Sequence, residues 1–364
     1  MRKWVVMGSV LVLAACTDVE EGERDEVAGN ANGEDAMMEE GESAGNTQVL
    51  ASNLEAPWAI EEEDGVFYLP QREGSLLRLE DGEVTEETLD LTEEVVQESE
   101  SGLLGFLLDE EFTENKRAYV YHTYEVNGEM NNRIVALTHE DGTWTEEEVL
   151  LEEIPGAATH NGGRLANGPD GMLYATTGDA ELPEAAQNTD SLAGKILRMD
   201  DEGGVPNDNP IEDSYVYSYG HRNPQGLAWL QDETMYASEH GPSAQDEINL
   251  IEAGNNYGWP EVEGDETAEG MEEPVIHSGD ETWAPSGIAV HNDFIYMAGL
   301  AGAAVYQVDP NEGSIDELTE DCGRIRDVHV DGNSLYFLTN NTDGRGSPGE
   351  DDDRLIEWSL NGSE

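Results

Sequence analysis

The sequence predicts an all-β protein, a six-bladed β-propeller made of four-stranded antiparallel sheets. A pattern of three apolar strands separated by polar turns occurs six times, and the second strand of each copy carries a tyrosine at the same place. These tyrosines recur every 40 to 62 residues, a period too long for helical solenoids and suited to four-stranded sheets. Radial packing of such sheets leaves few exposed strand edges. The marker tyrosines are Tyr68, Tyr119, Tyr174, Tyr236, Tyr296 and Tyr336.

Each copy begins with an apolar strand that we expect to line the central channel. These first strands are expected at residues 57–60, 104–107, 163–166, 226–229, 287–290 and 327–330. A short Asp/Gly/Asn turn leads into the second strand, which contains the marker tyrosine. The third strands are expected at residues 76–79, 134–137, 196–199, 248–250, 305–308 and 355–358.

The chain divides into three expected segments. Residues 1–15 resemble a lipoprotein signal peptide, because two basic residues precede an apolar run and residues 13–16 read Leu-Ala-Ala-Cys. Cys16 would then carry lipid, and the acidic residues 16–46 would form a disordered tether. Residues 47–364 form the propeller catalytic domain. We expect an exported protein, attached to the cell envelope only through the lipid on Cys16, in the periplasm or on the outer cell surface.

The charge is strongly negative, with 82 acidic and 16 basic residues and a net charge of −66. Nucleic acid is excluded as a partner, because its phosphates need Lys and Arg. The acidic residues are spread over every blade, and only three lysines occur in the chain. This pattern is typical of proteins that work in concentrated salt, where screening removes self-repulsion.

The loops that enter the first strands and those that join second to third strands should open on one shared face. Unusual residues in these loops should therefore meet in space, whereas the turns of the opposite face are plain acidic or Asp/Gly turns. The candidate site residues in these loops are Glu100, His160, Asp179, Arg222, Asn223, Arg324, Arg326 and Asn340.

The arginines are the most informative residues in the loops of this shared face. The chain has only 13, and Arg222, Arg324 and Arg326 fall in loops of the same face. A planar guanidinium suits carboxylates, so three converging arginines indicate an anionic ligand. The alternative is internal ion pairing, for example with Asp327.

His160 is a candidate general base, because the unperturbed pKa of histidine is near neutrality. Asp179 follows the second strand of the same blade and could orient the ring or pair with an arginine. His221 is equally well explained as a packing residue. The turn at Gly241 and Pro242, followed by Glu247 and Tyr257, offers carbonyl and carboxylate oxygens, which suit Ca²⁺.

At these residues the chain resembles the soluble sugar dehydrogenases that use pyrroloquinoline quinone (PQQ), particularly the aldose sugar dehydrogenase branch. The similarity runs over most of residues 47–364 and spans all six blades, and the family fold is a six-bladed propeller. The resembling stretches are residues 102–106, 160–165, 173–179, 191–195, 219–227, 239–242, 246–251, 256–260 and 323–328.

The resemblance implies roles for residues of the catalytic centre. His160 matches the base that takes the proton of the sugar C1 hydroxyl, while hydride passes to the quinone. Asp179 matches the acid that supports this histidine. Arg222 and Asn223 match residues near the reactive quinone carbonyl.

The resemblance also implies cofactor and metal sites. Arg324 and Arg326 match arginines that hold the PQQ carboxylates, and we expect Asn340 at the same site. Gly241 and Pro242 match carbonyls on a Ca²⁺ that polarises the quinone. Glu247 and Tyr257 match a second, structural Ca²⁺ site.

Two residues depart from the glucose-type members of the family. Ala301 lies where those members place a cofactor-binding lysine, and Glu100 lies where they have glutamine. Losing a cation and gaining an anion should weaken the hold on a tricarboxylate, because a charge-assisted contact is worth about 1.5–3 kcal/mol.

These observations predict a PQQ- and Ca²⁺-dependent dehydrogenase that oxidises aldose sugars at C1 to lactones and passes electrons to an external acceptor. Two alternatives stay open. One is a metal-dependent propeller hydrolase of the lactonase type, which would need a carboxylate-rich metal site at the channel centre. The other is a non-catalytic propeller that binds carbohydrate or protein.

Overall fold

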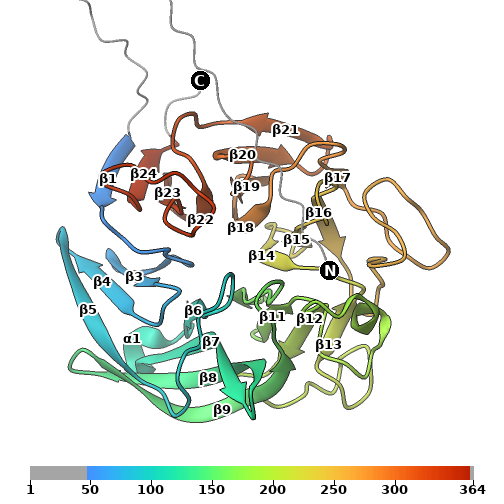
Figure 1. Ribbon diagram of the computed structural model, residues 1–364, viewed down its shortest axis with the longest axis horizontal. Helices are drawn as coiled ribbons and strands as arrows, with labels where there is room; N and C mark the ends of the chain where they lie inside the picture. The colour runs from blue at the N-terminus through green and yellow to red at the C-terminus, as the bar shows by residue number, and fades with distance from the viewer. Residues whose placement is uncertain (1–46, 361–364) are drawn as a thin grey trace, which may run out of the picture. The chain divides into compact units, whose positions relative to one another are not determined.

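The computed structural model describes residues 47–360. The expected signal peptide, Cys16 and acidic tether lie outside the described residues, as do the last four residues of the chain. The described part is a six-bladed propeller of antiparallel four-stranded sheets arranged around a central axis (Figure 1). This confirms the predicted fold.

The first three blades follow one another along the chain, each running from the axis outward. Blade 1 comprises β2 (Glu61–Glu63), β3 (Val66–Pro70), β4 (Leu76–Glu80) and β5 (Glu83–Asp90). Blade 2 comprises β6 (Leu103–Leu108), β7 (Arg117–Val126), β8 (Glu129–Glu140) and β9 (Thr143–Pro155), with the short helix α1 (Phe112–Asn115) between its first two strands. Blade 3 comprises β10 (Leu165–Asn167), β11 (Leu173–Thr177), β12 (Lys195–Met199) and β13 (Val216–Tyr219), with the 3-10 helix η1 (Pro183–Gln187) after β11.

The last three blades complete the ring. Blade 4 comprises β14 (Pro224–Trp229), β15 (Met235–Glu239), β16 (Glu247–Ile251) and β17 (Ile276–His277). Blade 5 comprises β18 (Pro285–His291), β19 (Phe294–Gly299), β20 (Ala304–Asp309) and β21 (Ser314–Glu317). Blade 6 comprises β22 (Ile325–Asp331), β23 (Ser334–Thr339), β24 (Leu355–Ser359) and, from the start of the described chain, β1 (Thr47–Ala51).

Two pairings join parts of the ring that sequence order alone does not connect. β1 pairs antiparallel with β24, so the first described strand closes the last blade. β5 pairs in parallel with β9, which merges blades 1 and 2 into one eight-stranded sheet. Both pairings cover an outer strand edge that would otherwise be open.

The expected strands agree with the structure except at the start of blade 1. Residues 57–60 make only an isolated bridge, between Pro57 and Gln71, and the ladder begins at β2. The reason lies in the central channel, where the Ile60 N–H donates to the Asp327 carboxylate over 2.8 Å instead of to a neighbouring strand.

Four of the six innermost strands contain an irregularity of register near their first residues, namely β6, β14, β18 and β22. Such bulges re-aim side chains at the end of a strand. In β14 and β22 the shifted residues are Gln225 and Arg326, which face each other across the channel and are joined by a 2.9 Å hydrogen bond. The strand irregularities therefore shape the mouth of the channel.

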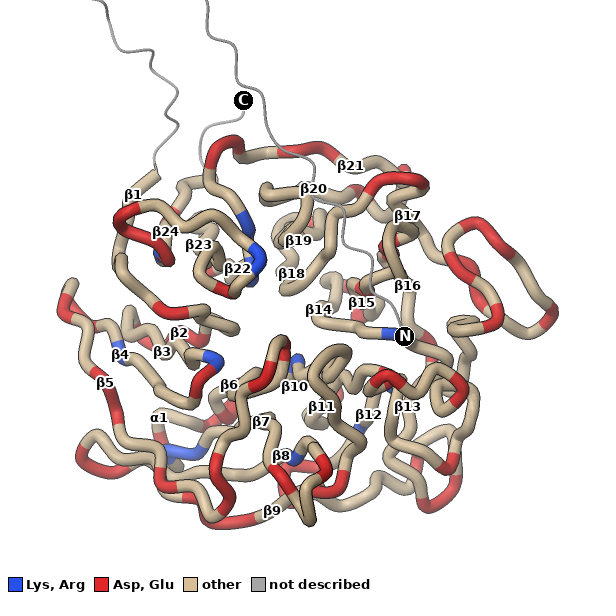
Figure 2. Tube along the Cα trace, viewed as in Figure 1, with Lys and Arg blue, Asp and Glu red and all other residues tan. Residues whose placement is uncertain are grey.

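The apolar core lies between neighbouring blades. One cluster, for example, packs Tyr296 and Val305 of blade 5 against Phe337 and Ile356 of blade 6. Asp and Glu lie along the outer strands and loops of every blade, whereas the few Lys and Arg include a group near the axis (Figure 2). In the described part of the chain no helix is long and apolar enough to cross a membrane.

Candidate active site

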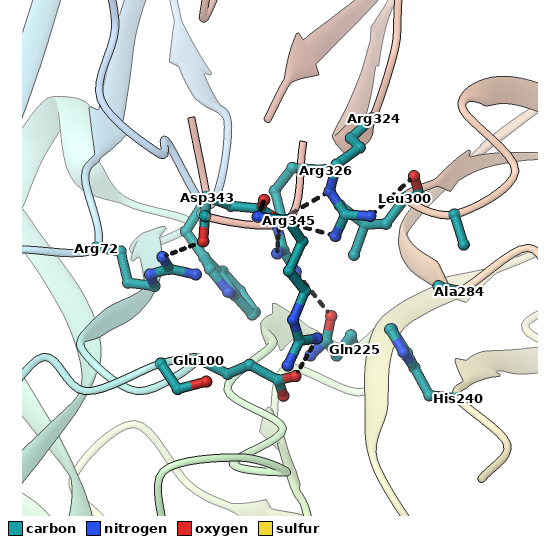
Figure 3. Close-up of a pocket in the computed structure, with 14 residues that line it drawn as sticks. Arg72, Glu100, Gln225, His240, Ala284, Leu300, Arg324, Arg326, Asp343 and Arg345 are labelled. Atoms are coloured by element: carbon teal, nitrogen blue, oxygen red, sulfur yellow. Dashed lines mark hydrogen bonds and ion pairs between the residues drawn. The ribbon is translucent and has the colours of Figure 1, made fainter. Parts of the chain in front are cut away.

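A cavity of about 400 Å³ opens at one end of the central channel (Figure 3). Its walls come from residues before the first strands and after the second strands of several blades, which confirms the expected meeting of these loops on one face. The volume lies in the usual range for a small-molecule site. The lining residues are Trp58, Arg72, Ser99, Glu100, Gln225, His240, Ala284, Leu300, Ala301, Arg324, Arg326, Asp343, Gly344 and Arg345.

Four of the lining residues are arginines, and Asp343 organises three of them. One oxygen of its carboxylate accepts from the Arg324 Nε and Nη2 at 2.9 and 2.8 Å and lies 4.0 Å from Arg326. Its main-chain carbonyl accepts from Arg72 at 3.0 Å. Positive charge at the cavity wall is therefore fixed in place by a single buried aspartate.

The positive charge exceeds what the protein itself neutralises. Arg72 and Arg326 are both buried, and the Nε of Arg72 is buried without a hydrogen-bond partner. Burial, followed by repulsion from Arg72, lowers the pKa of Arg326 to about 9. An anionic ligand would relieve this repulsion and supply acceptors, because guanidinium groups only donate. The cavity is therefore suited to an anionic ligand.

Beside the cavity, His160 and Asp179 form a hydrogen-bonded pair. The His160 Nδ1 lies 2.8 Å from the Asp179 Oδ1, and the indole N–H of Trp259 donates to the other carboxylate oxygen at 2.8 Å. Asp179 is fully buried, whereas the His160 side chain keeps 21% of its surface exposed. The Nδ1 side of the His160 ring is therefore held by a buried carboxylate, and part of the ring remains accessible to a ligand.

Arg222 determines which ring nitrogen of His160 carries the proton. Its Nη2 lies 2.9 Å from the His160 Nε2. Because a guanidinium has no acceptor, Nε2 must accept and the ring proton must sit on Nδ1, facing Asp179. This is the tautomer in which Nε2 can receive a proton from a bound hydroxyl.

Two hydrogen bonds connect the histidine pair with the cavity wall. The His160 main-chain N–H donates to the Glu100 Oε2 at 3.2 Å, and Arg222 donates to the carbonyl of His240 at 3.2 Å. Glu100 and His240 both line the cavity. His160 and Arg222 are therefore neighbours of the cavity and do not form part of its wall.

Two expected site residues lie behind the site. Asn223 is buried, and its side-chain oxygen accepts from the Gly162 N–H, which shapes the loop that carries His160. Asn340 is buried as well, between the Pro57 carbonyl and the Arg326 guanidinium. Both residues hold cavity elements in place, and neither lines the cavity. His221 is buried between Ser218 and Glu239, in agreement with a packing role.

The expected calcium residues gather around a small hollow next to Arg222. Gly241, Pro242, Glu247 and Tyr257 all line it. The Gly241 carbonyl accepts from the Arg222 Nη1 at 2.7 Å, so a cation bound to this carbonyl would have to displace that hydrogen bond.

The oxygens around the second expected metal site are of the type that Ca²⁺ prefers. Burial, followed by repulsion from Glu239, raises the pKa of Glu247 to about 8. The Tyr257 hydroxyl is engaged with Leu250 and Glu252, which leaves its main-chain carbonyl as the group that could reach a metal. Within residues 47–360 no group of three or more His, Cys, Asp or Glu side chains is placed to hold a metal ion.

Sequence reasoning misses three residues of the site. Asp343 and Arg345 lie in the long loop between β23 and β24, where Gly, Ser and Asp give no hint of which side chains turn inward. Trp259 follows the turn after β16, and its contact with Asp179 joins residues 80 positions apart. In the sequence, the 340–354 segment shows only that Arg345 and Arg354 stand among acidic residues.

The comparisons with known proteins agree with this geometry. The sequence profile of the family described as Glucose / Sorbosone dehydrogenase matches residues 54–347. An aldose sugar dehydrogenase of Escherichia coli is 30% identical, with 82% of this chain and 91% of that protein covered. Quinoprotein glucose dehydrogenase B of Acinetobacter calcoaceticus is 35% identical over 60% of this chain and 52% of that protein.

Solved structures give the same result. The PQQ-bound form of an aldose sugar dehydrogenase from Streptomyces coelicolor superimposes with a TM-score of 0.81 at 36% identity, and the match covers 87% of this chain and 98% of that one. The family profile covers all of the described propeller except its two ends, and the arginine cavity and the His160–Asp179 pair lie within the matched part. The chain belongs to the glucose/sorbosone dehydrogenase family.

Proposed function

We propose that this protein is a PQQ-dependent aldose sugar dehydrogenase that oxidises cyclic aldoses at C1 to lactones and passes the electrons to an external acceptor. One observation carries the proposal: an arginine-lined cavity adjoins a histidine whose Nε2 is an acceptor. The names of the relatives point to the same chemistry.

The donor set fits the cofactor. PQQ is a planar tricarboxylate, and Arg72, Arg324, Arg326 and Arg345 surround a cavity of suitable size. When bound, PQQ supplies an ortho-quinone that accepts the hydride leaving the sugar C1. The arginines would bind the carboxylates and stabilise the negative charge that the quinone oxygens gain.

His160 would remove the proton of the C1 hydroxyl. The hydroxyl takes the place of the Arg222 N–H at the Nε2, and the proton moves to this nitrogen as the C1–H bond breaks. Asp179 stabilises the resulting imidazolium, and Trp259 holds the carboxylate in position. Loss of the proton and the hydride leaves the C1 carbonyl of a lactone.

Ca²⁺ is proposed as a second requirement. The Gly241 and Pro242 carbonyls would hold one ion next to Arg222, where it would act as a Lewis acid. Glu247 would hold another, whose positive charge would offset the repulsion between Glu247 and Glu239.

The test uses purified protein with PQQ, Ca²⁺, an aldose and an artificial dye acceptor. We expect dye reduction that depends on PQQ and formation of the lactone in equal amount. If no dye is reduced and calorimetry shows no PQQ binding in the presence of Ca²⁺, the dehydrogenase proposal fails.

The same samples test the two alternatives. Hydrolysis of a lactone without PQQ would indicate a lactonase, and absence of both activities would leave a binding propeller. At the channel centre Arg164 pairs with Asp327 at 3.0 Å, and within residues 47–360 no group of three or more His, Cys, Asp or Glu side chains is placed to hold a metal ion. No observation therefore favours the hydrolase.

We further propose that the protein is exported and held at the cell envelope by lipid on Cys16. The pattern of residues 1–16 supports this proposal. Labelling with radioactive palmitate should mark the wild-type protein and leave a Cys16→Ala variant unlabelled. Equal labelling of both would contradict the anchor.

A further inference from the structure

Arg345 differs from the other three arginines of the cavity in how many of its donors are engaged. Arg72, Arg324 and Arg326 donate to protein carbonyls and side chains and are largely buried. The Arg345 side chain is 55% exposed, and its one ion pair joins Nη1 to the Glu100 Oε1 at 2.5 Å. A guanidinium has five N–H donors, so Arg345 retains several for a ligand.

The main chain beneath Arg345 is well fixed although the side chain is exposed. The N–H groups of Arg345 and Gly346 donate to the Asp343 Oδ1 at 2.8 and 3.2 Å. The same aspartate uses its other oxygen to hold Arg324. The loop that carries Arg345 is therefore tied to the arginine cluster, and the side chain reaches across the cavity towards Glu100 (Figure 3).

The β19–β20 loop contributes no charge to the cavity. Leu300 and Ala301 line this part of the wall, and the loop is completed by Gly302 and Ala303. The nearest cation is Arg324 of blade 6, whose Nη1 donates to the Leu300 carbonyl at 3.2 Å and whose Nε and Nη2 are held by Asp343. The lysine that glucose-type members of the family place in this loop is replaced by Ala301. A further arginine, Arg345, enters the same cavity from blade 6.

Both oxygens of Glu100 are engaged within the protein. One pairs with Arg345, and the other accepts from the main-chain N–H of His160. Burial alone would raise the pKa of Glu100, but Arg345 and other positive neighbours lower it, so this carboxylate is charged at neutral pH. Its charge serves to hold Arg345.

We propose that Arg345 is an anion-binding residue of the cavity, which supplies the cation absent from the β19–β20 loop, and that Glu100 is the positioning residue that holds its guanidinium over the cavity. The inference rests on the proposed PQQ site and adds a cofactor contact to it. It also revises the expectation that Glu100 and Ala301 together weaken cofactor binding.

The first experiment compares Arg345→Gln with Arg78→Gln, by calorimetric titration of PQQ into the full chain loaded with Ca²⁺. Arg78 is a matched control, because it makes a comparable ion pair with Glu80 at 2.8 Å and does not line the cavity. Arg345→Gln should bind PQQ about 10- to 100-fold more weakly, the range for loss of a charge-assisted contact. Arg78→Gln should bind as the wild type does.

The second experiment examines Glu100→Gln. If Glu100 positions Arg345, this variant binds PQQ more weakly than the wild type, and the Arg345→Gln/Glu100→Gln double variant binds no more weakly than Arg345→Gln alone, since the two act through one contact. If Glu100→Gln binds more tightly, Glu100 opposes the ligand and the proposal is overturned.

The third experiment moves the cation back to blade 5. Ala301→Lys should restore most of the affinity in the Arg345→Gln background and add less in the wild type, where Arg345 already serves the ligand. An equal gain in both backgrounds would show that the two positions bind independently and would overturn the proposed replacement.

The outcomes separate this inference from the proposed function. If the wild type binds PQQ and Arg345→Gln binds equally well, only the role of Arg345 falls. If neither the wild type nor Arg78→Gln binds PQQ, the cofactor site itself falls and the inference with it. Thermal unfolding of every variant checks that the fold is retained, as expected for an exposed side chain.

Discussion

At the scale of single residues, the main chain and the ring of His160 form hydrogen bonds with different partners. Its main chain bonds to Glu100 and Ala180, whereas its ring bonds to Asp179 and Arg222. A substitution that removes only the ring should therefore keep the loop in place. In the proposed reaction only the ring takes part in proton transfer.

We predict that His160→Ala abolishes sugar oxidation and leaves PQQ binding and the melting temperature nearly unchanged. Loss of a positioned general base lowers turnover by about 10²–10⁴-fold. Dye-linked turnover at saturating PQQ measures the effect, and calorimetry measures cofactor binding. A variant with more than about a tenth of wild-type turnover would show that another group takes the proton.

Trp259 provides a test of positioning behind the base. Trp259→Phe removes the donor to the Asp179 Oδ2 and keeps an aromatic ring, which Arg222 contacts at 5.4 Å. We expect turnover to fall about 10-fold with unchanged PQQ affinity, because a hydrogen bond to a buried carboxylate is worth about 1.5–3 kcal/mol. Trp283→Phe is the control, because the Trp283 ring packs near Tyr306 of blade 5, with the ring centroids 6.2 Å apart, and only its main-chain N–H donates to a carboxylate. Equal losses in both variants would refute the role of Trp259.

The residues found from sequence and those missed differ in a physical way. His160, Asp179 and Arg222 adjoin predicted strands, so the repeat places them at one mouth before any contact is known. Arg345 belongs to a loop whose path depends on hydrogen bonds to Asp343, and Trp259 reaches Asp179 across a turn. No periodic pattern encodes such contacts, so they appear only in three dimensions.

At the scale of elements, the main chain at the end of β11 lies in close contact with the loop that carries His160. A Cβ atom on Gly178, directly after this strand, would lie 1.9 Å from the His160 carbonyl oxygen. Only glycine allows this approach, and the approach places Asp179 next to the histidine ring. The order of residues after β11 thus sets the geometry of the His160–Asp179 pair.

We predict that Gly178→Ala lowers the free energy of unfolding by about 1–3 kcal/mol, the usual cost of overpacking. A shift of His160 by about 1 Å can lower turnover about 10²-fold. Gly349→Ala is the control, because the nearest atom to its added Cβ is the flexible end of Asp352 at 3.4 Å. Denaturant unfolding and turnover are measured for both. If Gly178→Ala has the stability and turnover of the wild type, the segments that contain Gly178 and His160 can move apart without a cost in free energy.

The strands themselves were predictable, but two features of their assembly were not. Alternation of apolar residues and turns identifies the inner three strands of every blade except blade 1, where the innermost strand lies at residues 61–63 and not at 57–60. The parallel β5–β9 pairing and the closure of blade 6 by β1 join outer strands that no short turn connects, so no local turn signal marks them as partners. Register at such edges is set by the closed ring and not by local sequence.

At the scale of the whole molecule, negative charge surrounds every blade, while the arginines of the site lie near the axis (Figure 2). The net charge of −66 costs the compact state self-repulsion at low salt. The Debye length falls from about 10 Å at 0.1 M to about 3 Å at 1 M salt, so repulsion between neighbouring carboxylates is then screened.

We predict that the melting temperature rises steadily as KCl is increased from about 0.1 M to above 1 M, because the repulsion among surface carboxylates is progressively screened over this range. The control is a triple variant, Glu83→Gln, Glu86→Gln and Glu147→Gln, at exposed positions of the joined β5 and β9 strands that form no ion pair with the described residues. This variant should melt higher than the wild type at low salt and gain less from KCl. A wild-type melting temperature that is flat or falls with KCl would contradict adaptation to salt. Equal slopes in the two proteins would show that salt acts on apolar burial, which it also strengthens, and not on charge repulsion.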